Sequence, residues 1–298
     1  MIINRAALDG IFTSFRADYQ AGTIAAKPLK DRFAMTSQSS TREETYGWLG
    51  AYNSLREWIG DRQLNGLVAH GFTIKNRTFE NTVSVSREDI EDDMIGVYSG
   101  AFQLMGADAS MHPDKLIFEL LRAGTTSTCY DGQNFFDTDH PINADNASAG
   151  TVSNCDMVNP SDAPEWVLMD TSKVIKPFIF QRRKDYTFVA KDQDGDDNVF
   201  MRNEYVYGVE ARVNAGYGLW QLAYGSNNDL SYANYATARA AMMKLKAPNG
   251  NPLGIVPDVL LVSPDYEAKA RDLILTPKYN DGAMNGTAEI IVCPWLGA

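Results

Sequence analysis

The sequence predicts an α+β fold, and three segments carry that prediction. Residues 4–21 place apolar side chains at the spacing of one helical face, with Asn4 in position to cap the helix. Residues 88–123 repeat that spacing over a longer stretch. Residues 166–224 are instead rich in β-branched and aromatic residues, in runs such as YTFVA and EYVYGVEARV. The chain therefore combines long helices with a strand-rich block.

The composition indicates a soluble globular protein with a sizeable core. The chain has 298 residues, of which 44% are hydrophobic and 22% charged, enough for one large domain or two of ordinary size. Its formal net charge of −11 does not favour nucleic-acid binding over the whole surface, although a local positive patch remains compatible. The three cysteines form no disulfide framework and point to a reducing compartment. We see no signal-peptide pattern and no apolar run of about 20 residues, so we expect no membrane contact.

Two segments are predicted to extend from the rest of the fold and to need a further surface on which to pack. Residues 23–44 are polar and weakly periodic, which favours an extended arm. Residues 63–86 alternate apolar and polar side chains, which predicts a β-hairpin with Lys75, Asn76 and Arg77 at its tip. A lone two-stranded hairpin is marginally stable in water, so it needs a further surface. The hairpin region is net positive, with five bases and three acids between residues 56 and 87.

The predicted long helix begins with a run of acidic residues. Ser86 with Asp89 resembles a capping box, and five of the six residues after Arg87 are acidic. Negative charge near a helix N-terminus contributes roughly 0.3–1 kcal/mol per residue, but only within the first turn, so five acids exceed that need. The opposite charges of the hairpin and the helix start indicate a contact between neighbouring copies. The candidates for this contact are Lys75, Arg77, Glu88, Asp89, Asp92 and Asp93.

Turn residues and short periodic runs organise the rest of the chain. Residues 124–164 are rich in Asp, Asn, Ser, Gly and Pro, which predicts a long loop. The DQDGDDN stretch at 192–198 predicts a turn between strands. It does not fit a calcium loop, because Gly195 comes too early. We further predict helices at 232–246 and 265–275, and strands at 199–201, 257–264 and 289–293.

The stretch CYDGQNFFDTDHP, residues 129–141, has the residue types of an active site but not the spacing. A hydrolase using Cys129 as nucleophile and His140 as base is the weakest alternative, because no histidine lies in a known catalytic or metal-binding pattern. A structural loop explains the stretch better, and we predict no catalytic, cofactor-binding or metal-binding residue. Its expected structural residues are Asp131 and Gly132 in a turn, Phe135 and Phe136 as core anchors, Asp139 in local hydrogen bonds, and His140 extended before Pro141.

Long ungapped stretches of the chain resemble one protein family. GFTIKNRTFENTVSVSREDIEDD at 71–93, YDGQNFFDTDHP at 130–141 and FMRNEYVYGVEARVNAGYGLWQLAYGS at 200–226 look like the Mu-like prophage major head subunit family. ETYGWLG at 44–50 and IIVCPWL at 290–296 share that resemblance, which runs over nearly the whole chain.

The resemblance implies a tailed-phage major capsid protein with the Hong Kong-97 type fold. The N-terminal arm then corresponds to residues 1–50 and the extended-loop hairpin to 51–87. The peripheral domain corresponds to 88–226, with a spine helix at 88–123, and the axial domain to 227–298. Members of this family act as shell proteins rather than enzymes.

The implied function is self-assembly of hexamers and pentamers into an icosahedral shell around packaged double-stranded DNA. The resemblance also implies scaffold, portal and decoration proteins as partners. It places the protein in the virion capsid, after assembly in the bacterial host cytoplasm. DNA would touch the inner face weakly, and the cluster Arg182, Arg183 and Lys184 faces DNA, another subunit or solvent. The alternative is the shell of a cellular, encapsulin-like nanocompartment that holds a cargo enzyme.

Overall fold

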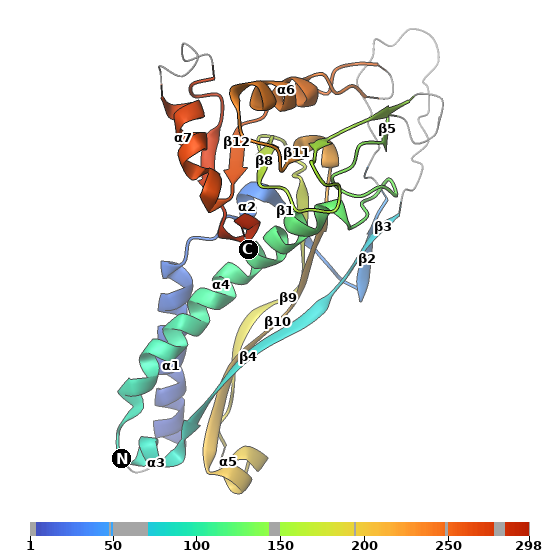
Figure 1. The fold of residues 1–298 in the computed structure, drawn as a ribbon. Helices are drawn as coiled ribbons and strands as arrows, with labels where there is room; N and C mark the ends of the chain where they lie inside the picture. Colours follow the sequence, from blue (N-terminus) through green and yellow to red (C-terminus); the bar gives the residue numbers. More distant parts are fainter. Residues whose placement is uncertain are drawn as a thin grey trace.

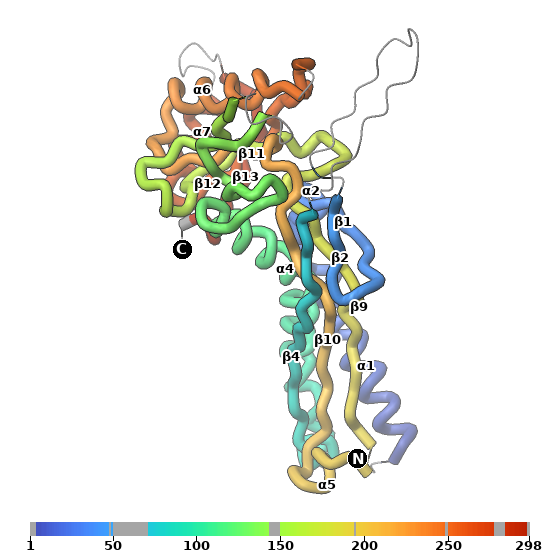
Figure 2. The backbone as a smooth tube through the Cα atoms, turned by 90° about the vertical axis from the view of Figure 1, so that its right-hand side faces the viewer, coloured from blue at the N-terminus to red at the C-terminus, as the bar shows by residue number. Residues whose placement is uncertain are grey.

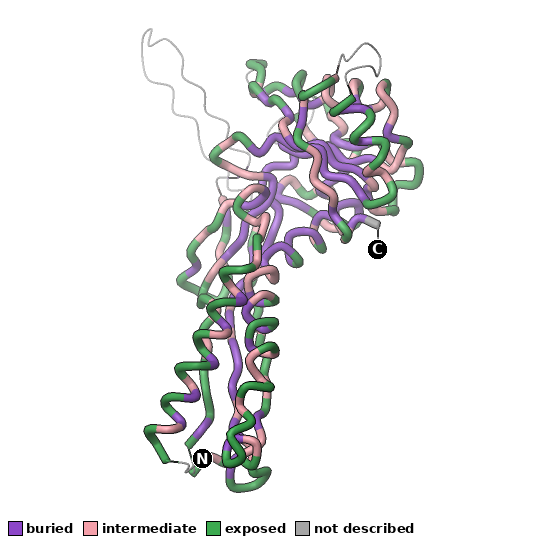
Figure 3. Tube along the Cα trace, turned by 90° about the vertical axis from the view of Figure 1, so that its left-hand side faces the viewer, coloured by how far each residue is buried: buried purple, intermediate pink, exposed green. Residues whose placement is uncertain are grey.

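The structure, a computed structural model, describes residues 4–47, 49, 71–142, 150–193, 195–247, 250–276 and 284–297. An elongated part holds two long helices against long strands, and a compact part lies at one end of it (Figures 1 and 2). The N-terminus lies at the far end of the elongated part, whereas the C-terminus lies where the two parts join. Buried residues fill the compact part and line the inner faces of the elongated part (Figure 3).

A four-stranded sheet forms one layer of the elongated part. Its order is β1 (Ala34–Gln38), β9 (Phe178–Lys191), β10 (Glu204–Tyr217) and β4 (Arg77–Ser86). The strands β9 and β10 have 14 residues each and pair antiparallel, so they span about 46 Å at about 3.3 Å per residue. The predicted strand-rich block is therefore confirmed for these runs, with the exception of residues 199–201.

Helices α1 (Arg5–Ala25) and α4 (Ser99–Arg122) form the other layer. The predicted helix at 4–21 is confirmed, including its cap, because Asn4 Oδ1 accepts from the backbone N–H of Ala7 at 2.9 Å. Phe15 stacks on Phe102 of α4 with ring centroids 4.3 Å apart, and it meets Tyr207 of β10 edge-on at 5.1 Å. This aromatic contact joins both helices to the sheet.

The predicted extended arm at 23–44 is wrong, because most of this segment packs on its own subunit. Helix α1 continues to Ala25, and a short helix α2 (Lys30–Phe33) follows with Phe33 fully buried. Strand β1 then pairs in parallel with β9, from Ala34 opposite Phe178 to Gln38 opposite Arg182. The polar composition of this segment gave no strand signal. Strand β1 nevertheless forms at the edge of the sheet, because pairing with β9 satisfies its backbone hydrogen bonds.

The predicted hairpin tip at Lys75, Asn76 and Arg77 is also wrong. Strand β3 (Phe72–Lys75) pairs with β2 (Glu43–Tyr46), whereas β4 pairs with β10, so the two predicted arms lie in different sheets. Asn76 between them is buried, and its side chain donates to Ser39 Oγ at 2.8 Å and accepts from Gln181 Nε2 at 2.8 Å. Residues 51–70 of the predicted hairpin lie outside the described residues.

The predicted spine helix at 88–123 starts later than expected. Ser86 caps a short helix α3 (Arg87–Glu91), as the capping pattern predicts, by accepting from the N–H of Glu88 at 3.2 Å. The chain then leaves the helical conformation at Asp93, whose φ is +60°, and passes through a 3₁₀ turn at Ile95–Tyr98 before α4 begins. Glu91, Asp92 and Asp93 lie at the C-terminal end of α3, where negative charge opposes the helix dipole, which gives a physical reason for this break. Pro113 lies inside α4 without ending it.

A five-stranded sheet forms the core of the compact part. Its order is β13 (Glu289–Val292), β12 (Val259–Val262), β8 (Trp166–Met169), β11 (Ala223–Ser226) and β7 (Cys155–Asp156). All residues of β8 and β12 are buried. The helices α6 (Tyr232–Met243) and α7 (Glu267–Leu275) lie beside the sheet, so both helices predicted for this region are confirmed. The sheet joins strands from both sides of the predicted boundary at 226/227.

Two connections contain more regular structure than predicted. Residues 192–198 do connect β9 to β10, but the connection contains helix α5 (Asp197–Arg202), so the strand predicted at 199–201 is wrong. The long loop at 124–164 contains the short pair β5 (His140–Pro141) and β6 (Thr151–Val152), in addition to β7. Among the described residues no helix is long and apolar enough to cross a membrane.

Candidate functional site

The loop that follows α4 is folded tightly onto the protein core. The backbone N–H of Phe136 donates to Gly124 O at 2.9 Å, and the N–H of Phe135 donates to Ser127 O at 3.0 Å. Phe135 is fully buried and stacks on Tyr217 of β10, with ring centroids 4.6 Å apart. Gly132 has φ +89°, a conformation that favours glycine at the turn after Asp131.

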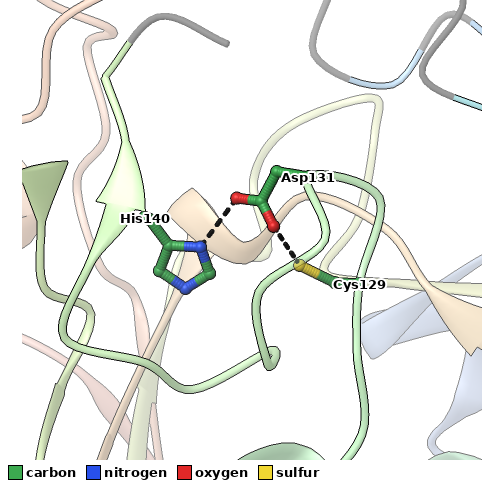
Figure 4. Close-up of side chains that lie close together, drawn as sticks. All are labelled: Cys129, Asp131 and His140. Atoms are coloured by element: carbon green, nitrogen blue, oxygen red, sulfur yellow. Dashed lines mark hydrogen bonds and ion pairs between the residues drawn. The ribbon is translucent and has the colours of Figure 1, made fainter. Parts of the chain in front are cut away.

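Within this loop, Asp131 joins Cys129 to His140 (Figure 4). Cys129 Sγ donates to Asp131 Oδ1 at 3.0 Å, and His140 Nδ1 lies 2.7 Å from Asp131 Oδ2. The backbone N–H of Gln133 donates to the same carboxylate at 3.1 Å. Side-chain exposure is 0% for His140 and 3% for Asp131, so the group is closed to solvent.

The electrostatics of this group oppose nucleophilic chemistry. Burial raises the pKa of the Cys129 thiol far above its usual value, and the neighbouring Asp131 carboxylate raises it further. Burial also tends to raise the pKa of Asp131, but hydrogen bonds from His140 and Cys129 outweigh it and leave that pKa below its usual value. The stable state is therefore a carboxylate beside a protonated thiol, and a thiol rather than a thiolate is a poor nucleophile.

His140 is placed as a packed ring rather than as a catalytic base. Its imidazole stacks on Trp220 with ring centroids 3.9 Å apart and an interplanar angle of 12°. Its Nε2 is buried and has no hydrogen-bond partner within the described part of the chain. A base must reach a substrate proton, and this ring has no exposed surface from which to do so.

The same three side chains have the donor types of a metal site. Their ligand atoms lie within 4.8 Å of one another. However, Cys129 binds a metal as a thiolate, which its raised pKa disfavours, and the carboxylate of Asp131 already accepts three hydrogen bonds. The arrangement therefore fits a structural link between the two ends of the loop better than a metal centre.

The aspartates near the end of the loop have different surroundings. Asp137 accepts from the backbone N–H groups of Asn134 at 3.2 Å and Thr138 at 2.7 Å. Asp139, the residue expected to bond locally, is exposed, and slight desolvation together with Asp137 raises its pKa. Asp137 therefore makes the backbone contacts that the sequence suggested for this part of the loop.

The structure does not bring the charged contact candidates together within one subunit. Lys75 and Arg77 lie at one end of β4, and the acids follow its other end at Ser86. The ten residues of β4 separate the two groups by about 33 Å at about 3.3 Å per residue. Asp89 accepts from the Tyr98 hydroxyl. Among the described residues, Lys75, Arg77, Glu88, Asp92 and Asp93 form no ion pair.

Comparison with known proteins decides the family. The family model for the Mu-like prophage major head subunit gpT matches residues 8–296. The chain belongs to this family of major head subunits. The head subunit is 39% identical over 305 residues to the major capsid protein of Escherichia phage Mu, covering 99% of this chain and 100% of that relative. It is 38% identical over 268 residues to the FluMu prophage major head subunit of Haemophilus influenzae, covering 89% and 87% of the two chains.

Solved capsid structures share the architecture of the head subunit. The procapsid of bacteriophage JBD30 contains a chain that is 41% identical, with a TM-score of 0.86 over 99% of this chain and 100% of that one. A chain of the JBD30 capsid is 30% identical, with a TM-score of 0.78 over 92% of both chains. These findings confirm the resemblance and the mixed α+β phage-capsid fold. The head subunit is thus a major capsid protein, a structural component of the virion rather than an enzyme.

Other candidate features of the head subunit have local explanations. In the basic cluster, Arg182 pairs with Asp185 at 2.9 Å and Lys184 pairs with Glu210, so two of its three charges are neutralised within the subunit. A cavity of about 270 Å³ between α4 and the sheet contains His112, whose Nδ1 lies 2.6 Å from the Tyr186 hydroxyl. That volume is below the range of about 300–1,000 Å³ usual for ligand pockets.

Proposed function

We propose that this major capsid protein self-assembles, through hexamers and pentamers, into an icosahedral shell that encloses packaged double-stranded DNA. The supporting observation is the end-to-end match to the chain of a phage procapsid, with a TM-score of 0.86 over 99% of this chain. Agreement over that length covers both the elongated and the compact part.

The proposal includes an assignment of the Hong Kong-97 type domains. The peripheral domain comprises the four-stranded sheet with α1 and α4, where α4 is the spine helix. The axial domain is the compact part built on the five-stranded sheet, which moves β7, β8 and β11 out of the peripheral block. The paired strands β2 and β3 form the base of the extended loop, since they bracket residues 47–71. The N-terminal arm is then short, because α1 packs on the spine helix.

The charge of the subunit suits a container for DNA. Its formal net charge is −11, and an acidic inner wall does not trap DNA through counterion release during packaging. A JBD30 capsid is decorated with trimers of a minor capsid protein. We include a decoration protein of this kind, together with a scaffold and a portal protein, among the partners of this subunit.

The test is electron microscopy of the purified protein, produced with and without phage growth. We expect closed shells from the subunit, and shells filled with DNA when they form during phage growth. A stable monomer that never assembles would overturn the proposal. Shells that hold a cargo protein and never DNA would instead support the nanocompartment. Cys129→Ala should leave assembly intact, which separates a shell protein from a hydrolase.

A further inference from the structure

The helix α5 carries two adjacent and highly exposed apolar side chains. Phe200 is 85% exposed and Met201 is 75% exposed. The helix lies at the end of the long strands β9 and β10, far from the compact part (Figures 1 and 2). Exposed apolar groups that lie together mark interaction surfaces more often than isolated ones do.

The structure holds α5 firmly in this exposed position. Val199 is buried in the same core as Ile90 and Tyr205. Asn198 Nδ2 donates to Lys191 O at 3.0 Å and to Glu204 O at 2.7 Å, which ties the helix to both strands. The exposure of Phe200 and Met201 therefore does not result from a loosely packed loop. It is a pre-organised surface, which loses little conformational entropy on binding.

The charges around this apolar pair complement a second copy of the same surface. The helix begins with Asp197 and ends with Arg202. Asp197 lies 3.8 Å from Lys191, with both side chains largely exposed, and Arg202 forms no ion pair among the described residues. When two such helices meet, the acid of one copy can lie beside the base of the other. A surface that complements itself is what symmetric assemblies require.

We infer that α5 helices of neighbouring copies meet in the shell, bury Phe200 and Met201 against each other, and pair Asp197 of one copy with Arg202 of the next. This inference rests on the proposed assembly and names one contact within it. The contact lies at the end of the elongated part opposite the compact part, so each subunit binds neighbours at its far end as well as through other surfaces.

Disulfide cross-linking tests whether α5 helices meet. The native cysteines Cys129, Cys155 and Cys293 are all buried, so they give little background. Shells of Phe200→Cys and of Met201→Cys should yield covalently linked subunits on oxidation. Val174→Cys is the matched control, because Val174 is 94% exposed in another loop and should give no link. Shells of both test variants that stay unlinked would overturn the inference, while wild-type shells would still support the proposed function.

A second experiment tests whether the contact matters for assembly. Phe200→Asp with Met201→Asp should lower the yield of shells at least tenfold, with an unchanged melting temperature of the free subunit, because both side chains are exposed. Val174→Asp should assemble normally. Normal shells from the double variant would refute the inference. So would undecorated shells of the Met201→Cys variant whose introduced thiol reacts fully with a bulky maleimide, since the surface would then be free for a different protein.

Discussion

At the scale of single residues, Asp131 holds the loop after α4 in place. Its carboxylate accepts from Cys129, His140 and the backbone of Gln133 in a site that solvent does not reach. Asp131→Asn removes one acceptor and leaves a buried donor unpaired, so we expect a loss of about 1–3 kcal/mol in the free energy of unfolding. Urea denaturation of dissociated subunits measures it. Asp139→Asn, at an exposed carboxylate of the same loop, should change stability by less than about 0.5 kcal/mol. Equal effects of both changes would contradict this role.

We expect the Asp131 carboxylate to make the free energy of unfolding depend on pH. Burial raises the pKa of Asp131, but the hydrogen bonds from His140 and Cys129 lower it more, so the pKa of the folded state lies below that of the unfolded state. Such a group contributes its full stability above its unfolded pKa of about 3.9 and loses it as the pH falls through the folded value. We expect the stability difference between wild type and Asp131→Asn to be largest near neutral pH and to shrink in acid. A difference that grows in acid would show that Asp131 is not stabilised as a carboxylate.

Part of this site could be predicted from the sequence, and part could not. The dipeptide Asp131-Gly132 and the paired phenylalanines carry local turn and core signals, and the structure places them in a turn and in the core. The link from Asp131 to His140 carries no such signal, because the stacking of His140 on Trp220 depends on a distant part of the chain. Cys129, Asp131 and His140 are residue types common in active sites, but their burial shows that they have a structural role here.

At the scale of elements, two glycines set the distance between α1 and α4. A Cβ on Gly106 would lie 1.9 Å from Tyr19 O, and a Cβ on Gly22 would lie 1.9 Å from Gln103 O. Gly106→Ala must push the helices apart, so we expect a loss of about 1–3 kcal/mol. Gly10→Ala is the matched control within α1, because nothing lies within 4 Å of its added Cβ. It should stabilise the subunit by about 0.5–1 kcal/mol through helix propensity. Thermal unfolding distinguishes the two, and a stabilising Gly106→Ala would refute the close approach.

The spacing of apolar residues along the chain determines neither strand partners nor helix boundaries. Alternating side chains identify β3 and β4 as strands, but alternation specifies the buried face and not the partner strand. Both strands pair with segments distant in sequence, β3 with β2 and β4 with β10. Likewise, helical spacing from residue 88 does not reveal the break at Asp93: Ile90 and Met105 of the predicted apolar stripe are buried in one core, but Val97 and Leu104 of the same stripe are exposed. Periodicity thus predicts that this segment is helical better than it predicts which side chains are buried or where the helix begins.

At the scale of the whole molecule, opposite charges lie at opposite ends of one strand. Lys75 and Arg77 are exposed at the start of β4, and Glu88, Asp92 and Asp93 are exposed beyond its end, about 33 Å away at about 3.3 Å per residue. Neither group finds an ion-pair partner among the described residues of its own subunit. This separation is what a heterologous contact needs, because each copy can offer its basic end to the acidic end of the next.

Charge reversal tests this contact in the assembled shell. Lys75→Glu with Arg77→Glu places like charges between copies, so we expect shell yield to fall at low salt while the melting temperature of the free subunit stays unchanged. Adding Glu88→Lys and Asp92→Lys restores opposite charges across the contact and should recover assembly. The effect should weaken at high salt, since the side chains are exposed and screened. Normal shells from the first variant at low salt would exclude the contact. A failure of the combined variant to recover would show that these bases have other partners.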